Sequence, residues 1–476
     1  MSAAAAFRLE EDLLGTLEVP ADVYYGIQTL RALENFHLSG VPLSEFPQLI
    51  IALAMVKQAA ADANHALGYL PAAKHAAISK ACERIIAGEF HDQFVVDMIQ
   101  GGAGTSTNMN ANEVIANLAL EFMGHAKGEY GYLHPNNDVN MAQSTNDAYP
   151  TAIRVGLLLI HGSLLDSLEK LVQAFADKGE EFTHILKMGR TQLQDAVPMT
   201  LGQEFRAFAT NLAEDLDRMR RLVPELLCEV NLGGTAIGTG INADPGYQSL
   251  AVERLAAISG QPVKPAPDLI EATYDMGDFV SLSGMLKRLA VKLSKISNDL
   301  RLLSSGPRTG INEINLPPRQ PGSSIMPGKV NPVIPEAVNQ VAFEVIGNDA
   351  ALTMAAEAGQ LQLNVMEPLI AYKLFDSFRL LQRAMDMLRE QCVVGITANE
   401  ERCRELMENS IGLITALNPY IGYENASRIA RQALTSGCGI LELVREQGLL
   451  DEATLAESLR PENMIAPRPV AIKNEA

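Results

Sequence analysis

Several long segments with helical spacing in the middle of the chain restrict the fold more than any other feature. Residues 150–175 are apolar around most of a helix circumference, as a helix buried on several sides must be. Residues 278–303 repeat apolar side chains at helical spacing, with lysines and arginines between them. Two further helices are predicted over about residues 332–359 and 367–393. Few segments alternate as strands do, so we predict a mainly α fold.

The long helices group into a central part of the chain with shorter elements on either side. They predict a helical bundle domain at residues 146–401, which also carries a serine-containing loop. Residues 1–145 alternate shorter helices with polar loops and predict an N-terminal domain, and residues 402–476 predict a small C-terminal domain. A monomeric bundle rarely hides so many apolar faces, so we expect a homo-oligomer.

Charge and cysteine usage limit the partners and the compartment. The formal net charge of -19 argues against nucleic acid and against an anionic membrane, because both need a basic surface. An anionic substrate would therefore need a local cationic pocket. The five cysteines form no CxxC pair, which favours free thiols in a reducing compartment. The N-terminus shows neither a signal peptide nor a membrane anchor, so we expect a cytoplasmic protein.

Residues 322–332, with the sequence GSSIMPGKVNP, are the most informative about function. Their glycines and prolines predict a loop that carries Ser323 and Ser324. Asn331 is predicted to cap the helix that follows, with a proline in its first position. A helix N-terminus favours anions, and Lys329 lies beside it. The segment is therefore typical of a carboxylate site.

Three other segments are rich in hydroxyl and amide groups next to a helix or a turn. They are residues 101–110 with Thr105, residues 143–147 with Ser144, Thr145 and Asn146, and residues 189–196 with Thr191 and Gln192. Taken singly, each segment is typical of an ordinary cap or turn. Together with the serine loop, they supply the groups needed to hold a small dicarboxylate by many hydrogen bonds.

Other chemistries find little support in the sequence. The eight histidines show no metal-binding spacing, and neither a GxSxG elbow nor a P-loop occurs. The glycines at residues 233–240 lack the strand context of a dinucleotide fingerprint, so we predict a tight turn there.

The run GSSIMPGKVNP resembles the signature of the aspartase/fumarase superfamily, whose members eliminate fumarate from a substituted succinate. Further similar stretches are GTSTNMNANEV, QSTNDAYPT, GRTQLQDAVPMTLGQEF, EVNLGGTAIGTG and SNDLRLLSSGPRTGINEINLP, so the resemblance spans nearly the whole chain. It implies a three-domain, mainly α fold. It also implies a homotetramer in which the central bundles form a twenty-helix core and each active site is shared between three subunits.

Within this family, the local sequence favours an ammonia-lyase acting on L-aspartate over a class II fumarate hydratase. Fumarases typically have a serine before the Gly-Thr of residues 104–105 and a glutamine after it, whereas this chain has Ala103 and Ser106. Thr145 stands where fumarases usually have a second serine. Gln192 replaces a histidine of many relatives and cannot shuttle a proton, although its amide could orient the substrate. A non-catalytic structural oligomer is the alternative from another class.

The resemblance also implies roles for single residues. Ser323 would be the general base that removes the Cβ proton of L-aspartate, and Asn146 would contact the amino group. The α-carboxylate would be bound by Lys329, Asn331 and Thr191. The β-carboxylate would be bound by Thr105, Ser144, Thr145 and Ser324. Two interpretations of Glu336 stay open. It is either a carboxylate that pairs with residue 192 or an ordinary acidic residue in the first turn of a helix.

No cofactor is implied by the reaction. Activation by Mg²⁺ is left open, because no set of ligands in the sequence identifies a metal site.

Overall fold

A computed structural model describes residues 6–467 of the chain. Helices dominate these residues, and the strands within them form four two-stranded sheets, so the mainly α prediction is confirmed. The chain divides into two compact units. Unit 1 takes in residues up to 166, 217–290 and 342–382, and unit 2 takes in residues 167–216, 291–341 and those from 383 onward. The division into three domains stays a prediction.

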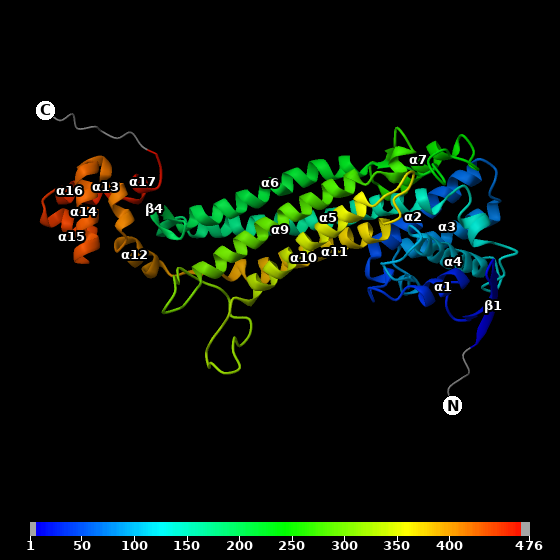
Figure 1. The fold of residues 1–476 in the computed structure, drawn as a ribbon, viewed down its shortest axis with the longest axis horizontal. Coiled ribbons are helices and arrows are strands. Elements are labelled where there is room, and N and C mark those ends of the chain that lie inside the picture. Colours follow the sequence, from blue (N-terminus) through cyan, green and yellow to red (C-terminus); the bar gives the residue numbers. More distant parts are fainter. Residues whose placement is uncertain (1–5, 468–476) are drawn as a thin grey trace. The chain divides into compact units, whose positions relative to one another are not determined.

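Five long helices, labelled in Figure 1, each contribute residues to both units. They are α5 (Thr145–Glu181), α6 (Leu201–Leu227), α9 (Gly277–Leu303), α10 (Val333–Glu357) and α11 (Glu367–Gln391). Four of them confirm predicted helices. The fifth, α6, is not among those predicted, although its buried side chains recur every three or four residues from Phe205 to Leu227.

Helix α5, with 37 residues, is the longest of the five. It is long and apolar enough to cross a membrane by length and composition alone, but 72% of its most apolar window is buried inside the protein. Such burial is typical of a core helix.

Helix α5 begins earlier than the apolar stretch predicted from residue 150, because it starts at Thr145 and Pro150 lies inside it. A proline lacks the N–H that would bond to the carbonyl four residues earlier, which here belongs to Asn146. The buried side chain of Asn231 donates to this carbonyl at 2.9 Å. A distant segment therefore supplies the donor that the proline removes.

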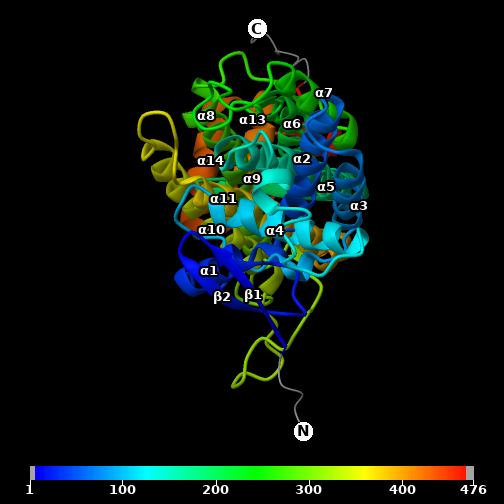
Figure 2. The same cartoon turned by 90° about the vertical axis from the view of Figure 1, so that its right-hand side faces the viewer.

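In unit 1, polar contacts join the bundle helices. Arg154 of α5 pairs with Asp278 of α9 at 2.9 Å, and Asp349 of α10 accepts hydrogen bonds from Ser283 and Lys287 of α9 at 2.8 and 2.6 Å. Helix α2 (Pro47–Ala66) packs against three others, α3 (Ala72–Ile86), α4 (Thr105–Phe122) and α7 (Tyr247–Ser259) (Figure 2). The smaller elements are β1 (Phe7–Asp12), β2 (Gly15–Pro20), α1 (Ile27–Asn35), α2 (Pro47–Ala66), α3 (Ala72–Ile86), α4 (Thr105–Phe122), a π-helical turn (Pro135–Val139), β5 (Glu229–Val230), α7 (Tyr247–Ser259), β6 (Lys264–Pro265) and α8 (Glu271–Tyr274).

In unit 2, aromatic side chains join the bundle helices. Phe175 of α5 packs against Phe205 and Phe208 of α6, with ring centroids 6.2 and 5.8 Å apart. The short helices near the C-terminus enclose an apolar core of their own. The smaller elements are β3 (Leu186–Thr191), β4 (Gln194–Thr200), β7 (Ile314–Asn315), β8 (Thr397–Ala398), α12 (Glu400–Glu408), α13 (Ile414–Ile421), α14 (Tyr423–Ser436), α15 (Ile440–Glu446), α16 (Glu452–Ser458) and α17 (Pro461–Met464).

Candidate active site

The serine loop, residues 316–332, joins β7 to α10 in unit 2. The Oγ atom of Ser323 accepts the backbone N–H groups of Ile325 and Met326 at 3.2 and 3.0 Å. Two N–H donors aimed at one hydroxyl oxygen stabilise negative charge on that oxygen. The loop geometry therefore favours the alkoxide that a serine base would need.

The neck of the serine loop closes on itself. The Gly322 N–H donates to the Lys329 carbonyl at 2.7 Å, and the Asn331 amide donates to the Gly322 carbonyl at 2.7 Å. The prediction of Asn331 as a helix cap is wrong, because α10 begins at Val333 and the Asn331 side chain is used within the loop. A Cβ atom at position 322 would lie 2.6 Å from the Lys329 carbonyl oxygen, so the neck requires glycine. The side chains of Ser324 and Lys329 take no part in the neck and are exposed.

The start of α5 presents Ser144 and Thr145 in unit 1. The Oγ atom of Ser144 accepts the Asn146 N–H at 3.2 Å, while Asp147 accepts the Ser144 N–H at 2.8 Å, which makes a reciprocal capping box. The Oγ1 atom of Thr145 accepts a hydrogen bond from the Asn108 amide at 3.2 Å. Each hydroxyl acts only as an acceptor among the residues that the structure describes, so its own hydrogen remains for donation. The two residues therefore offer donors to an anion at the positive end of α5.

A buried carboxylate fixes this end of α5. Asp147 accepts the backbone N–H groups of Gly233 and Thr235 at 2.9 and 3.0 Å, and the Asn146 amide donates to the Ala236 carbonyl at 2.7 Å. Burial raises the pKa of Asp147 to about 6, although the N–H groups that it accepts act in the opposite direction. The turn predicted at residues 233–240 is confirmed, and it holds the predicted site residues in place.

The loop before α4 packs directly against α5. Gly104 has a φ of +90°, and a Cβ atom there would lie 2.3 Å from the ring of Tyr149. Thr105 follows at the start of α4, and its hydroxyl donates to the Gly102 carbonyl at 2.8 Å. Its hydrogen is therefore engaged, unlike that of Thr145. Through this packing and the bond from Asn108, the structure brings the starts of α4 and α5 together.

Replacing Gly104 by alanine is expected to destabilise this junction. The added methyl group would strain a left-handed backbone and overlap the Tyr149 ring, and overpacking of this kind costs about 1–3 kcal/mol. The matched control is Gly124→Ala, which has a φ of +82° but no atom within 4 Å of the new methyl group. Thermal melting should show a larger loss for Gly104→Ala than for the control. Equal losses would mean that contact with Tyr149 does not constrain the loop.

Thr191 and Gln192 lie at the exposed end of the β3–β4 hairpin in unit 2. The two residues of its turn, Gln192 and Leu193, have φ values of +56° and +61°. Left-handed conformations at residues other than glycine cost roughly 1 kcal/mol or more each. Such strain persists where the surrounding structure imposes it, and it is common at functional sites.

An ionic cluster along β3 holds the hairpin in place. Glu313 is fully buried and pairs with Lys187 at 2.7 Å and with Arg190 at 2.8 Å. Lys187 also pairs with Glu204 of α6 at 2.5 Å. Glu313 directly precedes β7, so the cluster joins the hairpin to the segment that leads into the serine loop. No role was predicted from the sequence for Lys187, Arg190 or Glu313. Their positions beside the polar motifs could have indicated an ion-pair cluster.

The structure thus groups the predicted residues into separate sets. Thr105, Ser144, Thr145 and Asn146 share one region of unit 1, and Ser323, Ser324, Lys329 and Asn331 share the serine loop of unit 2. Between residues 6 and 467, no hydrogen bond or ion pair joins the hairpin residues Thr191 and Gln192 to that loop. Glu336 lies in the first turn of α10.

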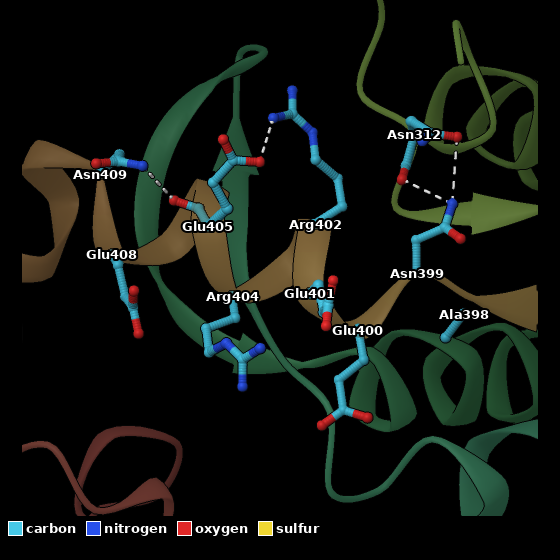
Figure 3. Close-up of a pocket in the computed structure, with 10 residues that line it drawn as sticks. All are labelled: Asn312, Ala398, Asn399, Glu400, Glu401, Arg402, Arg404, Glu405, Glu408 and Asn409. Atoms are coloured by element: carbon cyan, nitrogen blue, oxygen red, sulfur yellow. Dashed lines mark hydrogen bonds and ion pairs between the residues drawn. The ribbon is translucent and has the colours of Figure 1, made fainter. Parts of the chain in front are cut away.

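A polar hollow of about 790 Å³ on α12 lies in unit 2 and contains none of the predicted residues (Figure 3). Some of its side chains are engaged with one another: Arg402 donates to Glu405 at 2.8 Å, and Asn399 donates to the Asn312 carbonyl at 3.0 Å. Among the residues that the structure describes, no group of three or more His, Cys, Asp or Glu side chains is placed to hold a metal ion.

Comparison with known proteins covers almost the whole chain. Residues 15–347 match the family described as lyase, and residues 413–466 match the fumarase C C-terminus. The aspartate ammonia-lyase of Pseudomonas aeruginosa is 81% identical over 473 residues, which are 99% of this chain and 100% of that protein. The aspartate ammonia-lyase of Escherichia coli K12 is 57% identical over 461 residues, 97% of this chain and 96% of that protein.

Solved structures show the same likeness. A crystal structure described as fumarate lyase:delta crystallin from Brucella melitensis bound to cobalt has a TM-score of 0.94 and 59% identity, covering 97% of this chain and 100% of that one. The class II fumarase of Schistosoma mansoni has a TM-score of 0.90 and 35% identity, covering 96% and 99%. With the serine loop, the α5 hydroxyls and these similarities together, the chain belongs to the aspartase/fumarase family of lyases.

Proposed function

We propose that this chain is an aspartate ammonia-lyase that converts L-aspartate reversibly into fumarate and ammonia. The structural observation that carries the proposal is the pair of backbone N–H donors on Ser323 Oγ, at 3.2 and 3.0 Å. Full-length similarity to proteins named aspartate ammonia-lyase, at 81% and 57% identity, supports the choice of substrate.

In the proposed mechanism, the Ser323 alkoxide removes a proton from Cβ of L-aspartate. The electron pair left on Cβ delocalises into the β-carboxylate, which then carries a double negative charge. Collapse of this doubly negative intermediate forms the Cα–Cβ double bond and breaks the bond between Cα and nitrogen, which leaves as ammonia. Because the Cβ proton is weakly acidic, fixed donors at the β-carboxylate lower the barrier most.

The donors for this charge are the hydroxyls at the start of α5. Ser144 and Thr145 each keep a hydrogen for donation, and loss of one such donor typically costs about 3 kcal/mol of transition-state stabilisation. Ser324 completes the set around the β-carboxylate together with Thr105, whose hydroxyl would have to leave the Gly102 carbonyl, at 2.8 Å here, to donate to the substrate. In the same proposal, Asn146 contacts the amino group, and Gln192 orients the substrate through its amide. The α-carboxylate is held by Lys329, Asn331 and Thr191.

The active enzyme is proposed to be a homotetramer with active sites shared between subunits. Phe343, Ile346 and Met354 share one face of α10, and they are 62%, 37% and 72% exposed. A second copy of the bundle would cover this apolar face. The five free cysteines suit a reducing compartment, so we place the enzyme in the cytoplasm.

The test of the reaction is fumarate formation, followed by ultraviolet absorbance with L-aspartate or L-malate as substrate. Release from L-aspartate alone is expected. Release from L-malate alone would make the protein a fumarate hydratase, and no release from either would favour another amine substrate or a structural oligomer. The proposed chemistry uses no cofactor, so turnover should survive EDTA treatment, and adding Mg²⁺ afterwards tests the remaining option of metal activation.

Replacing Lys329 by alanine is expected chiefly to raise KM for L-aspartate, because the ammonium group would bind the α-carboxylate. Lys295→Ala is the control, since that side chain is 68% exposed on α9. Initial rates over a range of substrate concentrations separate KM from kcat. An unchanged KM for Lys329→Ala would remove the carboxylate role from this residue.

A further inference from the structure

Lys57 of α2 is a fully buried cation that the proposed mechanism does not use. Its Nζ atom donates to three amide oxygens, those of Asn108, Asn140 and Gln143, at 2.6, 2.9 and 2.9 Å. All three ammonium hydrogens therefore have acceptors, but no carboxylate touches the group in this cage. Burying a charge without a directly paired counter-charge is costly, which calls for a compensating role.

The environment of Lys57 brings the pKa of its ammonium group close to neutral pH. Burial lowers the pKa of Lys57 to about 7, and the Asp147 carboxylate and the Cys82 thiol act in the opposite direction. The nearby acid thus belongs to the start of α5, the same place as the predicted substrate hydroxyls.

The lysine also fixes which way the Asn108 amide faces. A lysine can only donate, so the oxygen of the Asn108 amide must face Nζ. The amide nitrogen then points the other way and donates to Thr145 Oγ1 at 3.2 Å and to Asn140 Oδ1 at 3.1 Å. The oxygen and nitrogen of an asparagine amide are hard to tell apart by shape alone, but here the Lys57 donor decides which is which.

We propose that Lys57 is a positioning residue that acts through Asn108 to hold the Thr145 hydroxyl as a hydrogen-bond donor to the β-carboxylate of a dicarboxylate substrate. The inference rests on the proposed function for its placement of the substrate at Thr145. Without the ammonium group, the Asn108 amide can turn its oxygen toward Thr145. The Thr145 hydrogen would then be donated inward, and the carboxylate would lose one donor.

The test measures binding of succinate, which has both carboxylates of L-aspartate but no amino group, by titration calorimetry on the intact oligomer. Lys57→Met is expected to raise the Kd for succinate about tenfold or more, the usual effect of losing one hydrogen bond to a charged group. The same change made in a Thr145→Val background should have little further effect, because the hydroxyl through which Lys57 acts is already gone. An unchanged Kd, or an equal effect in both backgrounds, would overturn the proposal.

A second variant keeps the test decisive if Lys57→Met does not fold. Asn108→Asp retains the partner of Lys57 and the shape of the side chain, but it replaces the donor to Thr145 by an acceptor. It should raise the Kd for succinate in the native background by clearly more than in the Thr145→Val background. If the Kd rises equally in both backgrounds, the increase comes only from the negative charge of the carboxylate that the variant adds, and the role assigned to Thr145 is overturned.

The control is Lys80→Met on α3, where the ammonium group lies over the ring of Phe122 at 4.3 Å and the side chain is exposed. This change should leave the Kd for succinate unaltered. Failure of the wild-type protein to bind succinate would overturn the inference. Failure of the wild-type protein to release fumarate from L-aspartate would instead overturn the proposed function, so the two outcomes remain separate.

Discussion

Replacing Ser323 by alanine is expected to lower kcat for L-aspartate by at least about a hundredfold, the effect of removing a positioned base. The two backbone N–H groups that now meet Ser323 Oγ would face no oxygen, and the reaction would lose its proton acceptor. The neck of the loop should survive, because it is closed by Gly322, Lys329 and Asn331 without the hydroxyl. Steady-state kinetics measures the effect, and size-exclusion chromatography checks assembly.

The control for this variant is Ser436→Ala, which removes an exposed hydroxyl near the end of α14. Its kcat should match that of the wild-type protein. Near-normal turnover of Ser323→Ala would reject the serine as base and require another group to take the proton.

Replacing Glu313 by alanine should cost about 3–5 kcal/mol in the free energy of unfolding, the usual effect of removing one partner of a buried ion pair. Lys187 and Arg190 would lose the carboxylate that they share, and both are largely shielded from water, with exposed side-chain fractions of 2% and 16%. Urea denaturation monitored by circular dichroism measures the loss. Glu313→Gln separates the effect of charge from that of volume and should retain most of the loss.

The matched control for Glu313 is Glu452→Ala, which breaks a pair with Arg445 whose side chains are 51% and 72% exposed. Exposed pairs contribute little, so no measurable change is expected. A loss below about 1 kcal/mol for Glu313→Ala would show that Lys187 and Arg190 are neutralised by other groups, with Glu204 the first candidate.

The helices could be predicted where burial dictates the pattern of side chains. Helices α5, α9, α10 and α11 carry apolar spacing that only a packed helix explains. Helix α6 carries the same signal but was not predicted, because the polar segment directly before it, residues 189–196, is typical of a cap or a turn. The cap assigned to Asn331 failed for a related reason, because a local preference was outweighed by closure of the loop on Gly322.

The sequence could indicate which polar residues belong to the candidate site, but not which of their hydroxyl groups are free to donate a hydrogen bond. The sequence identifies Ser144 and Thr145 as hydroxyls before a helix, but whether each hydrogen is free depends on groups far along the chain. The donor to Thr145 is Asn108, whose orientation depends in turn on Lys57. The buried cluster of Lys187, Arg190 and Glu313 is likewise set by contacts between distant segments.

The proline within α5 has a consequence for how this end of the protein orders. The carbonyl of Asn146 relies on Asn231, 85 residues later, and Asp147 relies on the turn at residues 233–240. The first turns of α5 therefore cannot complete their bonding until that later segment is in place. Local opening of either segment would release the other, so the two form one cooperative unit in hydrogen exchange, and the hydroxyls proposed to hold the substrate are ordered only when both are closed.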